Sequence, residues 1–183
     1  MENSTMKARR GLDYYRGIIE GLEPGTIERL DREESGPQGG AFWDEGGTIT
    51  YEHEQGGGAY TFASMCRSDQ AALLRVLDEN LPTRTTRPNT NTPTSYAIKH
   101  AAERCTGFYV SNLQAKVAMR ILGYKRSAGG LNPVYNITKR EWRAFSALSV
   151  NVEARRDEAR RRIARRDEQA ACARYFYRIA RTA

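Results

Sequence analysis

The sequence predicts an α+β fold: an N-terminal helix plus a small antiparallel sheet domain, then a C-terminal winged-helix-like helical domain with a long basic terminal helix. Three observations indicate this fold. Apolar residues recur at helical spacing in 6–22 and 95–122, short β-prone segments lie between 41 and 63, and arginine is abundant after 150. With 183 residues, of which 39% are hydrophobic, the chain is long enough to bury a modest core.

Residues 1–81 are expected to form an acidic α+β domain. A first helix is predicted over 6–22, and Pro24 ends its pattern. Ser68 is expected to cap a second helix that continues to Asn80. Between the helices, a charged turn and a glycine-rich run are expected to precede three short strands, at 41–43, 48–51 and 59–63.

Residues 82–94 are rich in Thr, Pro and Asn and contain no large apolar residue and no acid, which is typical of a linker. Arg84 and Arg87 stand among its hydroxyl and amide side chains. This segment is therefore also a candidate for contact with a phosphate backbone.

Residues 95–149 are predicted to form the winged-helix-like basic domain. Two short helices, 95–105 and 112–122, flank a turn that contains Gly107, and 124–137 can form a hairpin wing. In a winged helix the second helix enters the major groove and the wing contacts phosphate, whereas the alternative here is an ordinary solvated surface. Counting the linker arginines, the residues expected to bind nucleic acid or a protein partner are Asn112, Lys116, Arg120, Lys125, Arg126, Tyr96, Lys99, His100, Arg84 and Arg87.

After the wing, two further helices are expected. Thr138 and Glu141 form a capping box for the first, and 150–183 is predicted to be an Arg-rich C-terminal helix. The apolar stripe of this last helix is thin and interrupted by arginine, so a weak homodimer or none is predicted. Two i,i+4 ion pairs are expected along it: Asp157 with Arg161 and Glu158 with Arg162.

Charge is divided unevenly along the chain, which carries a formal net charge of +7. Residues 1–81 hold 8 Lys and Arg against 15 Asp and Glu, a net of −7, and residues 82–183 hold 21 against 7, a net of +14. A polyanion partner is therefore expected for the second half, and the clustered carboxylates of the first half could imitate a phosphate backbone. The alternative is that the two halves neutralise each other within the fold.

A series of motifs in residues 95–137 resembles one found in small phage and prophage proteins. Those proteins typically read S-Y-G-L-K-H, then Y-V-S-N, then A-G-Y or A-G-F. The matching residues here are Ser95-Tyr96-Ala97-Ile98-Lys99-His100, Tyr109-Val110-Ser111-Asn112, Leu122-Gly123-Tyr124 and, further on, Tyr135-Asn136-Ile137. Ala97 replaces the usual glycine and Leu122 the usual alanine. The resemblance implies an origin in a mobile element, and proteins of this kind commonly regulate transcription or block host defences.

The sequence offers little for catalysis, so no enzyme, cofactor or metal site is expected. The chain has two histidines and lacks G-x-S-x-G, H-E-x-x-H and phosphate-loop patterns. Its three cysteines are far apart, so neither a disulfide framework nor a zinc knuckle is indicated, which suits a reducing cytosol. No apolar segment reaches the length of a membrane span.

These observations favour a non-catalytic, phage-type binding protein in the host bacterial cytoplasm. Its expected partner is DNA, RNA, a host defence protein or a ribonucleoprotein complex. The favoured role is inhibition of host defence, in the manner of an anti-CRISPR protein. The alternative is a DNA-binding transcriptional regulator with a winged-helix domain, which would need a sharply specific and usually dimeric interface.

Overall fold

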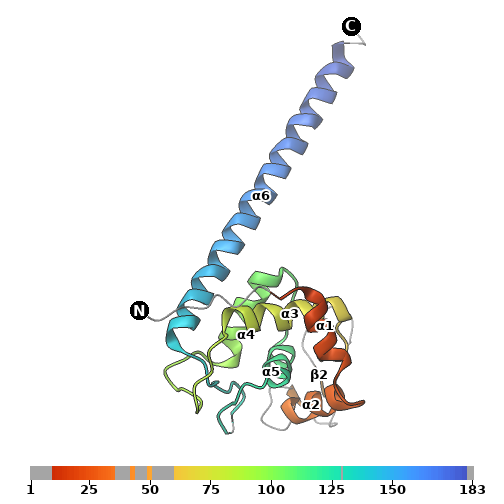
Figure 1. Cartoon of the computed structure of the whole chain (residues 1–183). Helices are drawn as coiled ribbons and strands as arrows, with labels where there is room; N and C mark the ends of the chain where they lie inside the picture. Colours follow the sequence, from red (N-terminus) through yellow and green to blue (C-terminus); the bar gives the residue numbers. More distant parts are fainter. Residues whose placement is uncertain (1–9, 36–41, 44–48, 51–59, 129, 181–183) are drawn as a thin grey trace.

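Helices make up most of the chain in the computed structural model, which describes residues 10–35, 42–43, 49–50, 60–128 and 130–180. Five short helices form a body, and a sixth, much longer helix leaves it (Figure 1). The bounds of these helices are α1 Leu12–Glu20, α2 Thr26–Ser35, α3 Arg67–Asn80, α4 Ser95–Thr106, α5 Asn112–Ile121 and α6 Lys139–Ala180.

The predicted α+β fold is wrong, because the described residues form no sheet on which the helices could pack. The strands β1 (Phe42–Trp43) and β2 (Ile49–Thr50) have two residues each and pair only with each other, in antiparallel register. Of the predicted third strand at 59–63, residues 60–63 are described, and they form a loop that leads into a turn. The fold is therefore helical, with one minimal β pair.

Helix α2 lies where the sequence predicted a charged turn. Its buried residues are Ile27, Leu30, Asp31 and Glu34, which occupy one helical face at spacings of three and four. Two of these four residues are acids, so hydrophobicity alone does not reveal this inward face. Hydrogen bonds compensate for the burial of Asp31, because its carboxylate accepts from the backbone N–H groups of Phe62 and Ala63, both at 2.9 Å.

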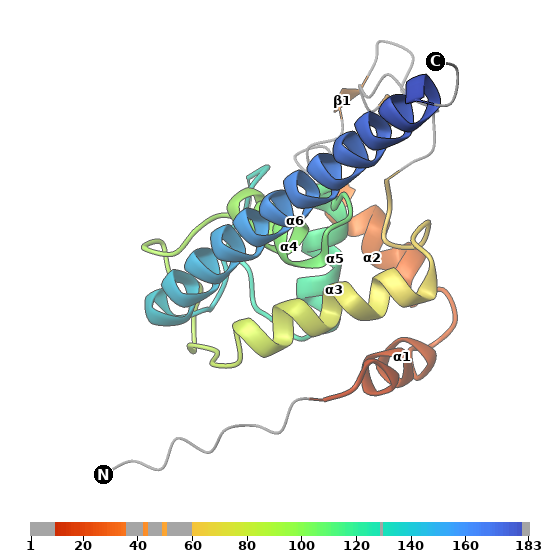
Figure 2. The ribbon, with the colours of Figure 1, turned by 90° about the horizontal axis from the view of Figure 1, so that it is seen from above.

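Helix α3 lies at the centre of the body. Its residues Leu73, Leu74 and Leu77 are fully buried. Helix α1 packs along α3, and α4, α5 and α6 contact α3 as well (Figure 2). One hydrophobic cluster consequently includes residues from both sides of 82–94, so the core does not divide at the predicted boundary between residues 81 and 82.

The predicted linker, 82–94, is tied to the segment that follows α5. Arg84 forms a β-bridge with Ile137, and Thr94 forms one with Val134. A third bridge, between Arg126 and Tyr135, lies within the predicted wing, which is therefore a hairpin-like turn held by isolated pairs. Polar side chains reinforce this arrangement, since Asn136 donates to the carbonyl oxygen of Thr85 at 2.8 Å.

A network of ion pairs joins α2 to α5. The carboxylate of Glu34, only 2% exposed, lies 3.1 Å from the guanidinium groups of both Arg120 and Arg126. The Nζ of Lys116 donates to the backbone oxygen of Glu34 at 2.6 Å, and Arg120 also pairs with Glu33 at 3.2 Å. Acidic residues of the first half thus neutralise basic residues of the second half inside the fold, which is the alternative that the charge pattern left open.

Helix α6 is a single continuous helix of 42 residues rather than the two helices expected. Thr138 caps it as predicted, because its hydroxyl accepts from the backbone N–H of Glu141 at 3.2 Å. The Glu141 carboxylate does not complete a capping box but accepts from the backbone N–H of Thr83, at 3.1 and 3.2 Å. This contact fixes the start of α6 to the segment after α3.

We predict that Glu34→Gln lowers the free energy of unfolding by about 2 kcal/mol, because the buried site loses a charged acceptor for two arginines. Chemical denaturation followed by circular dichroism measures this loss. Glu33→Gln is the matched control, since Glu33 is 40% exposed and also pairs with Arg120, and it should cost less than about 1 kcal/mol. Equal losses in the two variants would show that burial of Glu34 does not strengthen the network.

Candidate functional site

Helix α5, predicted to read the major groove, is the most enclosed helix of the body. Seven consecutive residues, from Leu113 to Met119, are buried, and Lys116 is 1% exposed. Burial lowers the pKa of the Lys116 ammonium, Glu34 opposes that shift, and Arg126 adds to it. Arg120 is held by Glu33 and Glu34. Groove reading by Lys116 and Arg120 is therefore corrected to an internal role, because both contact α2.

Asn112 and Arg126, two more of the predicted binding residues, also serve the fold. Asn112 donates to the side chain of Asn132 at 2.9 Å, and Arg126 pairs with Glu34. Arg84 places its guanidinium 4.6 Å from the centre of the Tyr124 ring, so it packs on the body although it is partly exposed.

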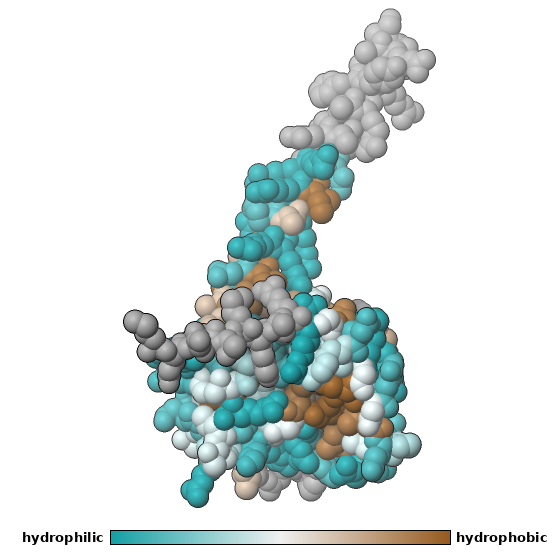
Figure 3. Space-filling model, in the orientation of Figure 1, coloured by the Kyte–Doolittle hydropathy of each residue, from teal (hydrophilic) through white to brown (hydrophobic). Residues whose placement is uncertain are grey.

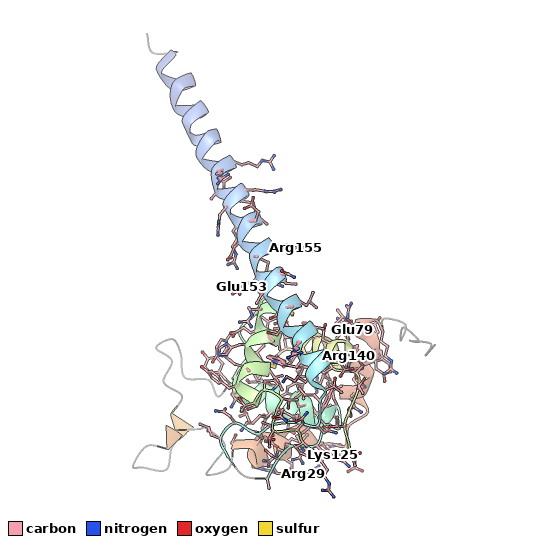
Figure 4. The ribbon with its side chains drawn as sticks, turned by 90° about the vertical axis from the view of Figure 1, so that its left-hand side faces the viewer. Arg29, Glu79, Lys125, Arg140, Glu153 and Arg155 are labelled. Carbon is pink, nitrogen blue, oxygen red and sulfur yellow. The ribbon has the colours of Figure 1, made fainter. Side chains whose placement is uncertain are left out.

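Lys125 and Arg87 have exposed side chains. Figure 4 labels Lys125 at the end of the body that lies away from the free end of α6. The ten predicted residues therefore do not make one surface.

Three of the predicted residues, Tyr96, Lys99 and His100, do come together, on the outer side of α4. The Nζ of Lys99 lies 5.8 Å from the ring centre of Tyr96 and 4.8 Å from that of Tyr109, which follows α4 in the turn to α5. Tyr96 and Tyr109 are 53% and 45% exposed, whereas Lys99 between them is buried. We call this group the tyrosine–lysine cluster.

Ion pairs and ring contacts fix the geometry of the tyrosine–lysine cluster. One Glu103 oxygen lies 3.3 Å from the Nζ of Lys99 and 3.2 Å from the Nδ1 of His100. The rings of Tyr96 and His100 meet edge to face with centres 4.6 Å apart. Partial burial raises the pKa of the Tyr109 hydroxyl, and the charge of Glu103 raises it further. Tyr109 therefore stays a neutral aromatic ring at physiological pH.

A cleft of about 340 Å³ adjoins the cluster, between the end of α4 and the base of α6. The residues of α4 and its turn that matter here are His100, Glu103 and Tyr109, and those of α6 are Glu153, Arg156 and Arg160. The carboxylates already have cationic partners, since Glu153 lies 3.8 Å from Arg104 and Asp157 lies 3.7 Å from Arg160. The lining of the cleft is consequently polar and of mixed charge.

Arg156 anchors α6 to the end of α4. Its guanidinium donates to the backbone oxygens of Arg104 at 2.6 Å and Cys105 at 3.0 Å, which are unsatisfied acceptors of the last helical turn. Gly107 ends α4 with a left-handed backbone, φ +84°. A Cβ atom at position 107 would lie 2.6 Å from the Arg156 guanidinium, so glycine is required for this contact.

Beyond this anchor, α6 carries many exposed arginines that were not among the predicted binding residues. Residues 155–167 contain seven arginines and three acids, and the described residues from 158 to 167 are all exposed. Glu158 pairs with Arg162 at 3.0 Å as predicted, but Asp157 pairs with Arg160 instead of Arg161. Figure 3 shows a largely hydrophilic surface along this part of α6. The arginine runs at 160–162 and 165–166 are the feature of the sequence that could have indicated this surface.

We predict that Gly107→Ala destabilises the protein more than Gly123→Ala. Both glycines follow a helix with φ near +80°, where a Cβ atom costs about 1 kcal/mol, but a Cβ at 123 meets nothing within 4 Å. The excess at 107, about 1 kcal/mol, is the loss of the Arg156 hydrogen bonds. Denaturation in an Arg156→Met background checks the cause, because there the two alanine variants should cost the same. An excess that survives in that background would contradict it.

Comparisons with known proteins add no family to this picture. None of the helices in the described ranges is both long and apolar enough to cross a membrane. Among the same residues, no three His, Cys, Asp or Glu side chains are grouped to hold a metal ion. A scan against protein-family models finds no matching family, and searches of curated proteins and of solved structures find no match.

Proposed function

We propose that this is a non-catalytic binding protein whose arginine-rich helix α6 contacts the phosphate backbone of nucleic acid, either free or within a host nucleic-acid-handling complex. The observation that carries the proposal is the net charge of +4 in residues 155–167, given by seven arginines against three acids on a stretch of helix that is exposed except at Arg156 and Asp157. Arginine is the side chain best suited to paired hydrogen bonds with phosphate.

Of the seven arginines in 155–167, three are engaged within the protein, Arg156, Arg160 and Arg162, and the other four are available. Among the described carboxylates, none forms an ion pair with Arg155, Arg161, Arg165 or Arg166. The pKa of Glu158 is lowered by its hydrogen bond to Arg162, and the charges of Arg165 and Arg161 add to the shift, as expected in a positive potential. By contrast, Arg120 and Arg126 of the body are already paired with Glu34.

The position of α6 also favours a large polyanionic partner. The helix leaves the body beyond its anchor, so its arginines are not screened by neighbouring elements (Figure 1). Glu153 and Arg155 mark the level at which it leaves (Figure 4). Backbone contact of this kind is electrostatic and needs no reading of base sequence.

The biological role that we propose is inhibition of a host defence complex in the bacterial cytoplasm, and it rests on the motif series shared with small phage and prophage proteins. A winged-helix transcriptional regulator is not proposed, since the helix that would read the groove is buried against α2. A protein that holds backbone through α6 fits an inhibitor better, because covering the nucleic acid of a defence complex does not require a specific sequence.

We predict that replacing Arg161, Arg165 and Arg166 with glutamine weakens binding of an oligonucleotide and lowers its salt dependence. Loss of three phosphate contacts should reduce the slope of log K against log salt by about 2 to 3. Fluorescence anisotropy across a salt series measures this slope.

The control removes the same number of charges from the body, by Arg16→Gln, Arg29→Gln and Arg32→Gln, and should change the slope little. All three control arginines lie on α1 or α2 and are exposed. Equal changes in the two triple variants would mean that net charge alone, and not α6, determines binding. Absence of binding by the unaltered protein at low salt would refute the proposed function.

A further inference from the structure

We infer that the tyrosine–lysine cluster and the adjoining cleft bind the unpaired bases of a single-stranded nucleic acid whose phosphates lie along α6. This inference rests on the proposed function and adds the class of nucleic acid. It uses residues that the phosphate contact does not require. Three features support it: two tyrosines are exposed, the cleft is of mixed charge, and both lie beside the base of α6.

Tyr96 and Tyr109 offer two aromatic faces at the surface. They are 53% and 45% exposed, although tyrosine rings of this size gain free energy by burial. The buried Lys99 ammonium lies against both rings, and His100 packs edge to face on Tyr96. Both rings are therefore supported by neighbouring side chains. Base stacking on exposed aromatic side chains is how single strands are bound without strong sequence preference.

The cleft suits a base better than a phosphate group. Arg156 at its wall is engaged with the backbone oxygens of Arg104 and Cys105, and the carboxylates of Glu103 and Glu153 pair with Lys99 and Arg104. The cleft therefore has little unpaired positive charge to attract phosphate, while its carboxylate oxygens can accept hydrogen bonds from the amino groups of bases. The remaining positive charge lies further along α6, at Arg161, Arg165 and Arg166, which are spread around the helix, with Arg166 nearest to the side of Arg156.

The tyrosine–lysine cluster and the cleft are adjacent, so a single strand could pass from one to the other. Tyr109 and His100 line the cleft together with Arg160, and Tyr96 contacts His100. Bases held at the tyrosines would therefore leave the neighbouring phosphates near the first exposed arginines of α6. A duplex cannot use this path, because its bases are stacked and paired in its interior.

The test compares three probes: a single-stranded oligonucleotide of about 12 nucleotides, the duplex of the same sequence, and linear polyphosphate. We expect the unaltered protein to bind the single strand about tenfold more tightly than the other two probes. In Tyr96→Ala with Tyr109→Ala this margin should disappear, while affinity for duplex and polyphosphate stays the same. Tyr96→Phe with Tyr109→Phe should keep the margin, because phenylalanine also stacks.

Two further variants test whether the effect is specific to the cluster and whether a single surface change is enough to produce it. Tyr14→Ala removes an equally exposed tyrosine, 45%, from α1 and should leave all three affinities unchanged. Tyr96→Ala alone changes a surface position and should still weaken single-strand binding about fivefold. No preference for the single strand, or a preference that survives loss of both tyrosines, would overturn the inference while leaving the proposed function in place. The glutamine variant of Arg161, Arg165 and Arg166 weakens all three probes if the proposed function holds, so the two failures are distinguishable.

Discussion

The buried carboxylate of Glu34 determines how α2, α5 and the hairpin-like turn are arranged. A carboxylate removed from water is stable only when charges or hydrogen-bond donors surround it, and Arg120 and Arg126 meet that requirement. The same contacts turn the basic side of α5 inward against α2. Once Lys116, Arg120 and Arg126 are used inside the body, the densest exposed positive charge that remains is on α6, whereas Lys125 and Arg87 are single exposed charges. One internal ion network thus decides which basic helix can face a partner.

Local signals in the sequence predicted much of the C-terminal half. Helices α4 and α5 were expected within a residue or so of their ends, because apolar spacing and capping residues are properties of a few neighbouring positions. Ser111 caps α5 with Gln114, and Gly123 adopts the left-handed conformation expected after a helix. These features do not depend on what the helix packs against.

The orientation of α5 and the existence of α2 could not be predicted in the same way. Helix α5 carries Lys116 on a face that looks solvent-exposed until α2 is placed over it, and α2 itself has Asp31 and Glu34 on its inward face. The buried side of each helix therefore looks like a solvent-exposed side in the sequence. A polar residue at a core position can be recognised as buried only when its partner is known. Segment 82–94 is similar, because its packing against 133–137 depends on backbone pairing that composition does not record.

The motif series of residues 95–137 separates into two kinds of residue once the contacts are known. Ser111, Tyr124 and Asn136 serve the fold: Tyr124, for example, donates its hydroxyl to the carbonyl oxygen of Leu81 at 2.6 Å. Tyr96, His100 and Tyr109 are not needed for the core and remain at the surface. A motif that combines scaffold and surface residues is consistent with proteins that keep one fold in order to present one surface.

Helix α6 extends far beyond its anchor at Arg156. At 1.5 Å per residue, the helix from Arg156 to Ala180 is about 36 Å long, so a tilt of about 5° at the anchor moves the tip by about 3 Å. The length of α6 beyond this anchor, rather than the size of the body, therefore sets how distant a partner the helix can reach.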